Sequence, residues 1–366
     1  MLFRSQLFYL FYNFSLAKIL NFILVISFIK FKILLINKRI YHIIYYIYNK
    51  DGDFLSKISI IGAGSIGSTT AFALLQKGIA REIVINDINQ EKALGEVLDL
   101  MHGSSLCPPC NVTLGSVDDT KDSDIIIITA GSPQKPGETR LDLVDKNYKI
   151  FQSFIPKLAS LSPNSILLVV SNPVDILSYM TYKLSGFPKE RVIGSGTVLD
   201  TARLRSLLSK YFRIDGRNVE GFVLGEHGDS EFVTWSSLRV GSIPVKSFSE
   251  QNSISWDKET ENVIAEDVKN CAYEVIKRKG ATAFAVAVAL VRIVEAILRD
   301  EKTILTLSTL LNDYLGVSNT YLSVPTIVGR NGIEKVLDIQ LSTEEQEKFI
   351  SSANLMKQYI TRIDSH

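Results

Sequence analysis

Short apolar runs and helical patterns alternate through the middle of the chain. Ile58–Ile61, Ile125–Ile128 and Ile166–Val170 are almost wholly apolar, as parallel strands are when helices cover both faces of a sheet. Segments with helical spacing, such as Thr70–Leu75, lie between them. This alternation predicts an α/β fold with a doubly wound parallel sheet over residues 57–195.

The pattern changes from about Thr197. Helical spacing extends over Glu261–Arg278 and Thr282–Arg299. Runs typical of an antiparallel sheet then follow at Ile304–Leu311, Tyr321–Val328 and Val336–Ile339. We therefore expect a first, α/β domain at residues 56–196 and a second, α+β domain at residues 197–366.

Residues 1–55 are a different kind of sequence, rich in Phe, Ile, Leu, Tyr, Lys and Asn. Leu7–Ile29 contains a single charge, Lys18, so its length allows a membrane anchor, although Asn and Ser residues interrupt it. Alternatively, the true start of the protein lies further along, and these residues are translated upstream sequence. We expect membrane contact only if this extension is part of the protein, and the first strand, at Lys57, does not require it.

Charge and cysteine content exclude several classes of protein. The first 50 residues hold seven Lys or Arg and no acid, so the remaining sequence is acidic overall, which argues against a nucleic-acid partner. Cys107, Cys110 and Cys271 do not form a disulfide framework, which fits the reducing cytoplasm. The sequence Cys107-Pro-Pro-Cys110 is interpreted as a surface loop, with a redox or metal role as the alternative. No second ligand pair has suitable spacing, so we expect no metal.

A glycine-rich turn follows the first strand. Its residues are Gly62, Ala63, Gly64, Ser65, Ile66 and Gly67. This GxGxxG spacing between a strand and a helix lets the backbone approach a pyrophosphate at the helix N-terminus. A second strand leads to Asp87, twenty residues after the last glycine, where an acid accepts hydrogen bonds from the adenosine ribose. The turn and the acid together predict NAD as the cofactor.

Candidate catalytic residues are few, because the chain has only four histidines. His227 lies between glycines in Gly225-Glu-His-Gly-Asp-Ser230, and the near-neutral pKa of an ordinary imidazole suits a general acid. Asp200 and Arg203 are three residues apart on one helical face, where they could orient a histidine and bind a carboxylate, or form an ordinary ion pair. A Gly- and Pro-containing loop at residues 133–138, before Arg140, has the composition of a mobile lid.

These segments together resemble the lactate and malate dehydrogenase family, and within it the bacterial L-lactate dehydrogenases, over residues 57–362. The segments that carry the resemblance are Gly62–Gly67, Ala130–Val144, Val170–Asp175, Asp200–Arg203, Gly225–Ser230 and Lys279–Thr282. The resemblance implies reversible reduction of pyruvate to L-lactate by NADH in fermentative glycolysis, by a cytoplasmic homotetramer.

The resemblance also implies roles for individual residues. His227 would donate and accept the proton, Asp200 would hold it, and Arg203 would bind the substrate carboxylate. Arg140, carried by the lid, would polarise the reacting carbonyl. Positions implied to contact substrate or nicotinamide are Asn172, Thr282 and Val286.

Gln134 separates the two activities of the family. Malate dehydrogenases of this family carry an Arg there, which pairs with the second carboxylate of oxaloacetate, and a neutral Gln would forgo about 3–5 kcal/mol of that interaction. We therefore expect pyruvate as substrate, with malate or a bulkier 2-hydroxy acid as the alternative. A related fold serves NAD-dependent glycosidases that use a metal, but no Cys accompanies His227 or Asn172 as a ligand.

Many bacterial relatives in this family bind fructose 1,6-bisphosphate between subunits through an Arg and a His. This sequence differs from them at one of these two positions. The Arg corresponds to Arg205, but the His position is Glu220. Because a carboxylate repels a phosphate, we expect weak or absent activation by this effector.

Overall fold

The computed structural model describes residues 56–132 and 140–364. The chain divides into two units, Met1–Gly52 and Asp53–His366, and the description that follows concerns the second. No helix within the described ranges is both long and apolar enough to cross a membrane. The expectation of an N-terminal anchor concerns residues that lie outside these ranges.

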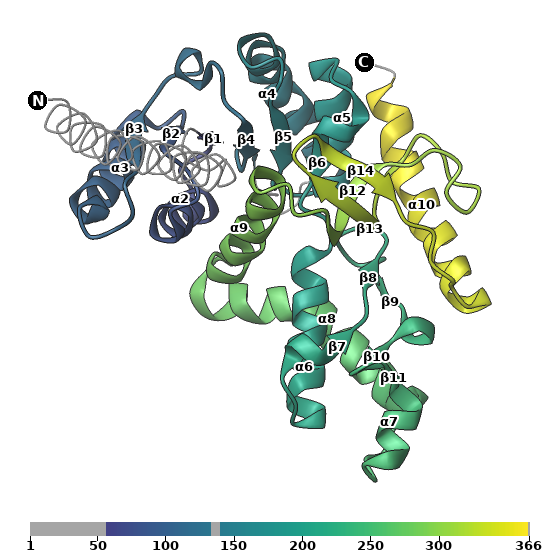
Figure 1. Ribbon diagram of the computed structural model, residues 1–366. Coiled ribbons are helices and arrows are strands. Elements are labelled where there is room, and N and C mark those ends of the chain that lie inside the picture. The colour runs from purple at the N-terminus through teal and green to yellow at the C-terminus, as the bar shows by residue number, and fades with distance from the viewer. Residues whose placement is uncertain (1–55, 133–139, 365–366) are drawn as a thin grey trace, which may run out of the picture. The chain divides into compact units, whose positions relative to one another are not determined.

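A nine-stranded sheet runs through the described chain in the order β14-β13-β12-β6-β5-β4-β1-β2-β3 (Figure 1). Six strands are parallel: β1 (Lys57–Ile61), β2 (Glu82–Asn86), β3 (Asn111–Leu114), β4 (Ile125–Ile128), β5 (Ile166–Val169) and β6 (Val192–Gly194). Three are antiparallel: β12 (Thr303–Leu310), β13 (Tyr321–Gly329) and β14 (Gly332–Val336). The expected doubly wound parallel sheet followed by an α+β region is confirmed.

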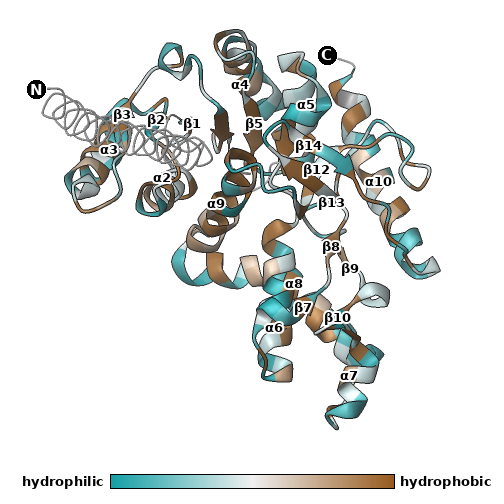
Figure 2. Cartoon of the chain, in the orientation of Figure 1, coloured by the Kyte–Doolittle hydropathy of each residue, from teal (hydrophilic) through white to brown (hydrophobic). Residues whose placement is uncertain are grey.

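Helices cover both faces of this sheet, which explains its unbroken apolar strands. One face packs against α2 (Ser65–Lys77), α3 (Gln90–Ser104) and α9 (Phe284–Leu298). The other packs against α4 (Arg140–Leu161), α5 (Val174–Ser185) and α10 (Thr343–Ile363). In β4, Ile125 and Ile127 face the first layer and Ile126 and Ile128 the second. Figure 2 accordingly shows β4 and β5 as hydrophobic.

A third hydrophobic core lies among elements of the second half. Its helices are α6 (Val198–Phe212), α7 (Val245–Gln251) and α8 (Lys258–Lys279). Its strands are β7 (Val219–Glu220), β10 (Arg239–Val240) and β11 (Ile243–Pro244) in one small sheet, and β8 (Val223–Leu224) and β9 (Phe232–Val233) in another. Short 3₁₀ turns lie at Asp118–Thr120, Lys189–Arg191, Gly216–Asn218 and Trp235–Ser237.

One expected strand differs from the structure. The run Val336–Ile339 is not a strand, because β14 begins directly after a two-residue turn that Gly332 permits with its φ of +94°. Elsewhere in this domain, Gly221 separates β8 from β7, which belongs to a different sheet. The antiparallel strands also extend the parallel sheet through the pairing of β12 with β6.

Candidate functional site

The turn between β1 and α2 has the shape that a dinucleotide phosphate needs. Gly62 has a φ of +112°, and its N–H donates to the carbonyl of Asn86 at 2.7 Å. A side chain at Gly67 would come within 1.9 Å of the Gly62 carbonyl oxygen, so only glycine fits there. No atom lies within 4 Å of where a Cβ of Gly64 would stand, which leaves the backbone open to a ligand. No side chain caps α2, so its first N–H groups remain available to a phosphate.

Asp87 is held at the end of β2 next to this turn. Its Oδ2 accepts a hydrogen bond from the N–H of Ala63 at 2.6 Å, and its Oδ1 accepts one from the N–H of Asn89 at 2.8 Å. The carboxylate therefore holds the glycine turn in place through Ala63. It also lies where an acid is expected to accept hydrogen bonds from the adenosine ribose. The turn and Asp87 fit the adenosine half of NAD, and Ser65 and Ile66, at the start of α2, belong to the same cradle.

His227, Asp200 and Arg203 form one hydrogen-bonded cluster. His227 Nδ1 lies 2.6 Å from Asp200 Oδ2, and Arg203 Nη1 donates to Asp200 Oδ1 at 2.6 Å. The Asp200 side chain is only 1% exposed, whereas those of Arg203 and His227 are 14% and 22% exposed. Asp200 thus forms an ion pair with Arg203 through one oxygen and orients His227 through the other. His227 is left with Nε2 to exchange a proton with a substrate.

The cluster favours a protonated imidazole. Burial lowers the pKa of His227. The charge and the hydrogen bond of the adjacent Asp200 carboxylate raise it by more, so that the pKa is about 9. Burial would raise the pKa of Asp200, but the charges and hydrogen bonds of His227 and Arg203 outweigh it and lower that pKa. The imidazolium is therefore the main form at neutral pH, ready to donate a proton to a carbonyl oxygen.

Residues that sequence reasoning did not single out tether the loop of His227. The main-chain N–H of His227 donates to Asp175 Oδ2 at 2.8 Å, and Asp175 Oδ1 accepts from the hydroxyl of Ser308 at 2.5 Å. The N–H of Glu226 donates to Ser352 Oγ at 2.8 Å. Asp175 is fully buried, and burial raises its pKa to about 6. Its place in the segment Val170–Asp175 was the only signal for it, because contacts across α5, β12 and α10 are not legible from the sequence.

Other expected ligand residues lie at the ends of elements. Asn172 is exposed three residues after the end of β5, and its peptide bond to Pro173 is cis. Thr282 lies between α8 and α9 and is half-buried. Val286, in the first turn of α9, packs partly against the core beneath the glycine turn.

Two expected residues of the lid cannot be placed. Gln134 lies outside the described residues. Arg140 begins α4, as expected, but its side chain is also outside the description.

Arg205 and Glu220, the two positions expected to decide binding of fructose 1,6-bisphosphate, lie near each other but form no ion pair. Burial lowers the pKa of Arg205, and the nearby charge of Glu220 opposes this. Within the part of the chain that the structure describes, the buried Nε of Arg205 has no hydrogen-bond partner. Glu220 is exposed on β7.

The CxxC sequence lies in a turn between α3 and β3. Cys107 and Cys110 are free thiols that are half-buried against the core beside α2 and α3, rather than in a loop detached from the fold. Burial raises the pKa of Cys110 to about 11, so it holds its proton at neutral pH. A reactive thiolate needs the opposite shift.

Models of known families match nearly all of the described chain. Residues 56–194 match the lactate/malate dehydrogenase NAD binding domain, and residues 197–365 match the lactate/malate dehydrogenase alpha/beta C-terminal domain.

Curated relatives and solved structures agree with these matches. An L-lactate dehydrogenase of Clostridium perfringens is 56% identical over 305 residues, which are 83% of this chain and 96% of that protein. L-lactate dehydrogenase 1 of Clostridium acetobutylicum is 53% identical over 308 residues, 84% of this chain and 98% of that protein. The crystal structure of a minor L-lactate dehydrogenase from Enterococcus mundtii aligns with a TM-score of 0.82 at 38% identity, over 85% of this chain and 99% of that one.

Proposed function

Because the chain belongs to the lactate/malate dehydrogenase family and is an NAD-dependent enzyme that reversibly reduces pyruvate to L-lactate, we propose that His227, Asp200 and Arg203 carry out this reaction. The observation that supports the proposal is the sharing of Asp200, whose two oxygens bind His227 and Arg203 at 2.6 Å each. Bound NADH supplies a hydride to the carbonyl carbon of the substrate.

Each residue of the cluster has a separate task. His227 holds a proton at Nε2 and gives it to the carbonyl oxygen as the alcohol forms, then takes it back in the reverse direction. Asp200 accepts from Nδ1, which fixes the ring and stabilises the imidazolium. Arg203 keeps N–H donors beyond the one given to Asp200, and these bind the substrate carboxylate. Arg140 polarises the carbonyl when the lid closes.

The remaining residues bind the two ligands. Gly62–Gly67 and Asp87 hold the pyrophosphate and ribose of NAD, which fits the open approach at Gly64. Asn172, Thr282 and Val286 contact the nicotinamide and the substrate. We also retain the division into domains at residues 56–196 and 197–366, and we place the enzyme in the cytoplasm, where its three free cysteines would stay reduced.

Substrate preference tests the assignment of Gln134. We expect the full-length protein to oxidise NADH much faster with pyruvate than with oxaloacetate or 2-oxoisocaproate, because a neutral amide gives a second carboxylate no charged partner. Gln134→Arg should shift the oxaloacetate-to-pyruvate ratio of kcat/KM by about 10²- to 10³-fold, and Gln134→Asn should keep the preference for pyruvate. Preference of the wild type for oxaloacetate would refute the selection of pyruvate by Gln134. Strong activation by fructose 1,6-bisphosphate in the same assay would refute the effect ascribed to Glu220.

Association into a homotetramer is supported by exposed apolar residues on helices. On α3, Leu94, Leu98 and Met101 are 39%, 43% and 48% exposed and recur every three or four residues, so they form one stripe. We expect sedimentation velocity to give the mass of four chains and Leu98→Glu to lower it. Ile350→Glu, an equally exposed apolar position on α10, is the matched control and should leave the mass unchanged. A monomeric wild type would contradict the proposal.

A further inference from the structure

Glu231 is a buried acid next to the cluster of His227 and Asp200. It is 4% exposed, and one side-chain nitrogen or oxygen from each of these three residues lies within 4.8 Å of the other two. Among the described residues, its carboxylate makes no hydrogen bond and no ion pair, although its main-chain N–H donates to the carbonyl of Gly228 at 3.1 Å. A buried carboxylate without such partners is costly to keep charged, so its position calls for an explanation.

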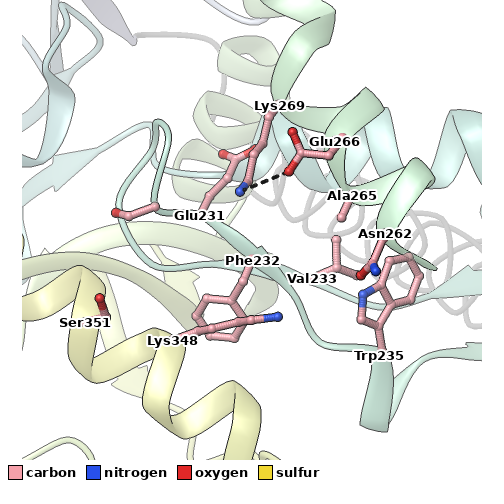
Figure 3. A pocket seen from close by; sticks show the side chains of 11 residues that line it. Glu231, Phe232, Val233, Trp235, Asn262, Ala265, Glu266, Lys269, Lys348 and Ser351 are labelled. Atoms are coloured by element: carbon pink, nitrogen blue, oxygen red, sulfur yellow. Dashed lines mark ion pairs between the residues drawn. The ribbon is translucent and has the colours of Figure 1, made fainter. Parts of the chain in front are cut away.

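A pocket of about 280 Å³ opens at Glu231, on the side formed by α8 and α10 (Figure 3). Lys269 and Glu266 of α8 line it and lie 3.7 Å apart as an ion pair, and Lys348 of α10 lines it from the other side. Phe232 and Trp235 supply apolar walls. The pocket thus gives Glu231 a route for proton exchange with water, beside a cation that favours its charged form.

The charges around Glu231 place its titration close to that of His227. Burial raises the pKa of Glu231 to about 8, and the neighbouring charge of Asp200 adds to this, while His227, Arg203 and Lys269 oppose it. Glu231 is therefore mostly neutral at pH 7 and charged above pH 8. The pKa of His227 is about 9, and the charge of Glu231 acts on it in the same direction as that of Asp200. Asp175, which binds the main chain of His227, also raises it.

We propose that Glu231 is a positioning residue of the catalytic cluster, which acts through its charge on His227 and sets how firmly that ring holds the catalytic proton. The inference rests on the proposed role of His227 and deepens it. As the pH rises, Glu231 loses its proton to water in the pocket and becomes an anion beside the imidazolium. This second anion keeps His227 protonated to a higher pH than Asp200 alone would, so pyruvate reduction extends further into the alkaline range.

Glu231→Gln removes this charge with little change of shape. In pyruvate reduction, kcat/KM of the wild type should fall as the pH rises and His227 loses its proton. In Glu231→Gln this fall should begin at a pH lower by about 0.5–1 unit, which makes kcat/KM about three- to tenfold lower on the alkaline side. Lactate oxidation needs the neutral ring, so its rise with pH should shift downward by the same amount. Glu231→Asp, which restores an acid, should move both profiles back toward those of the wild type.

Glu266→Gln is the matched control. It makes the same chemical change on the wall of the same pocket, but the Glu266 side chain is 65% exposed and is not among the groups that shift the pKa of His227. It should leave both profiles unchanged. If Glu231→Gln folds poorly, Lys269→Met provides a second test, because loss of the cation favours neutral Glu231 and should move the profiles in the same direction, by less. Profiles of Glu231→Gln that coincide with those of the wild type would overturn the proposal.

A titration that does not depend on turnover separates this inference from the proposed function. The chain has only four histidines, so ¹³C-labelled imidazole signals can be followed singly by NMR, with His227→Asn identifying the resonance of His227. A lower pKa of His227 in Glu231→Gln, in an enzyme that does not turn over pyruvate, would support the charge effect and refute the reaction. Normal turnover together with an unchanged pKa of His227 in Glu231→Gln would support the reaction and refute the charge effect.

Discussion

His227→Asn is expected to lower kcat/KM for pyruvate by about 10²- to 10⁴-fold and to leave the affinity for NADH unchanged. An asparagine amide can still donate a hydrogen bond to Asp200, but it cannot transfer a proton to the carbonyl oxygen. The imidazole is suited to this transfer because its Nδ1 is bound to Asp200 at 2.6 Å, and the carboxylate helps raise its pKa to about 9. Steady-state kinetics and a fluorescence titration with NADH measure the two quantities.

His102→Asn is the matched control for this variant. His102 is exposed near the end of α3 and belongs to no part of the proposed cluster, so kcat/KM should stay within experimental error of the wild type. Retention of near-normal activity by His227→Asn would remove His227 from the reaction. Loss of NADH binding together with activity would instead mean that the substitution disturbs the glycine turn or the fold.

The sequence predicts the central fold well because local patterns and tertiary burial agree there. Ile125–Ile128 are all apolar since helices pack on both faces of β4, and the burial of all four follows. The glycine turn is equally readable, because contact at Gly67 leaves no room for a side chain. The limits of β14 were missed because the turn before Gly332, and not the apolar run, decides where the strand begins. The continuation of the parallel sheet into β12 is a tertiary pairing without a local signal.

The site is only partly readable for a related reason. Asp200 and Arg203 share a helical face by spacing alone, but spacing could not distinguish an isolated ion pair from one in which Asp200 also binds His227, 27 residues further on. The roles of Asp175 and Glu231 depend on burial and on contacts across α5, α6 and α8, which no spacing reveals. The sequence does not reveal how deeply each acid is buried or which charges surround it, and these two properties decide whether the acid is protonated.

Arg203→Gln is expected to lower kcat/KM for pyruvate by about 10²- to 10³-fold, mainly through KM, because the substrate carboxylate loses a charged partner in a partly buried site. Arg203 is 14% exposed and gives one N–H to Asp200, so its remaining donors are largely shielded from water. The affinity for NADH should not change.

Pyruvamide, which lacks the carboxylate, distinguishes this role from a purely structural one. If Arg203 binds the carboxylate, the variant and the wild type should reduce pyruvamide at similar, low rates. If Arg203 serves only to hold Asp200, both substrates should lose activity by the same factor, and the proposed role would be wrong. Arg217→Gln is the control, because Arg217 also pairs with an aspartate, Asp215, but its side chain is 88% exposed. Loss of that pair should affect neither substrate, since an ion pair in water contributes little and lies outside the cluster.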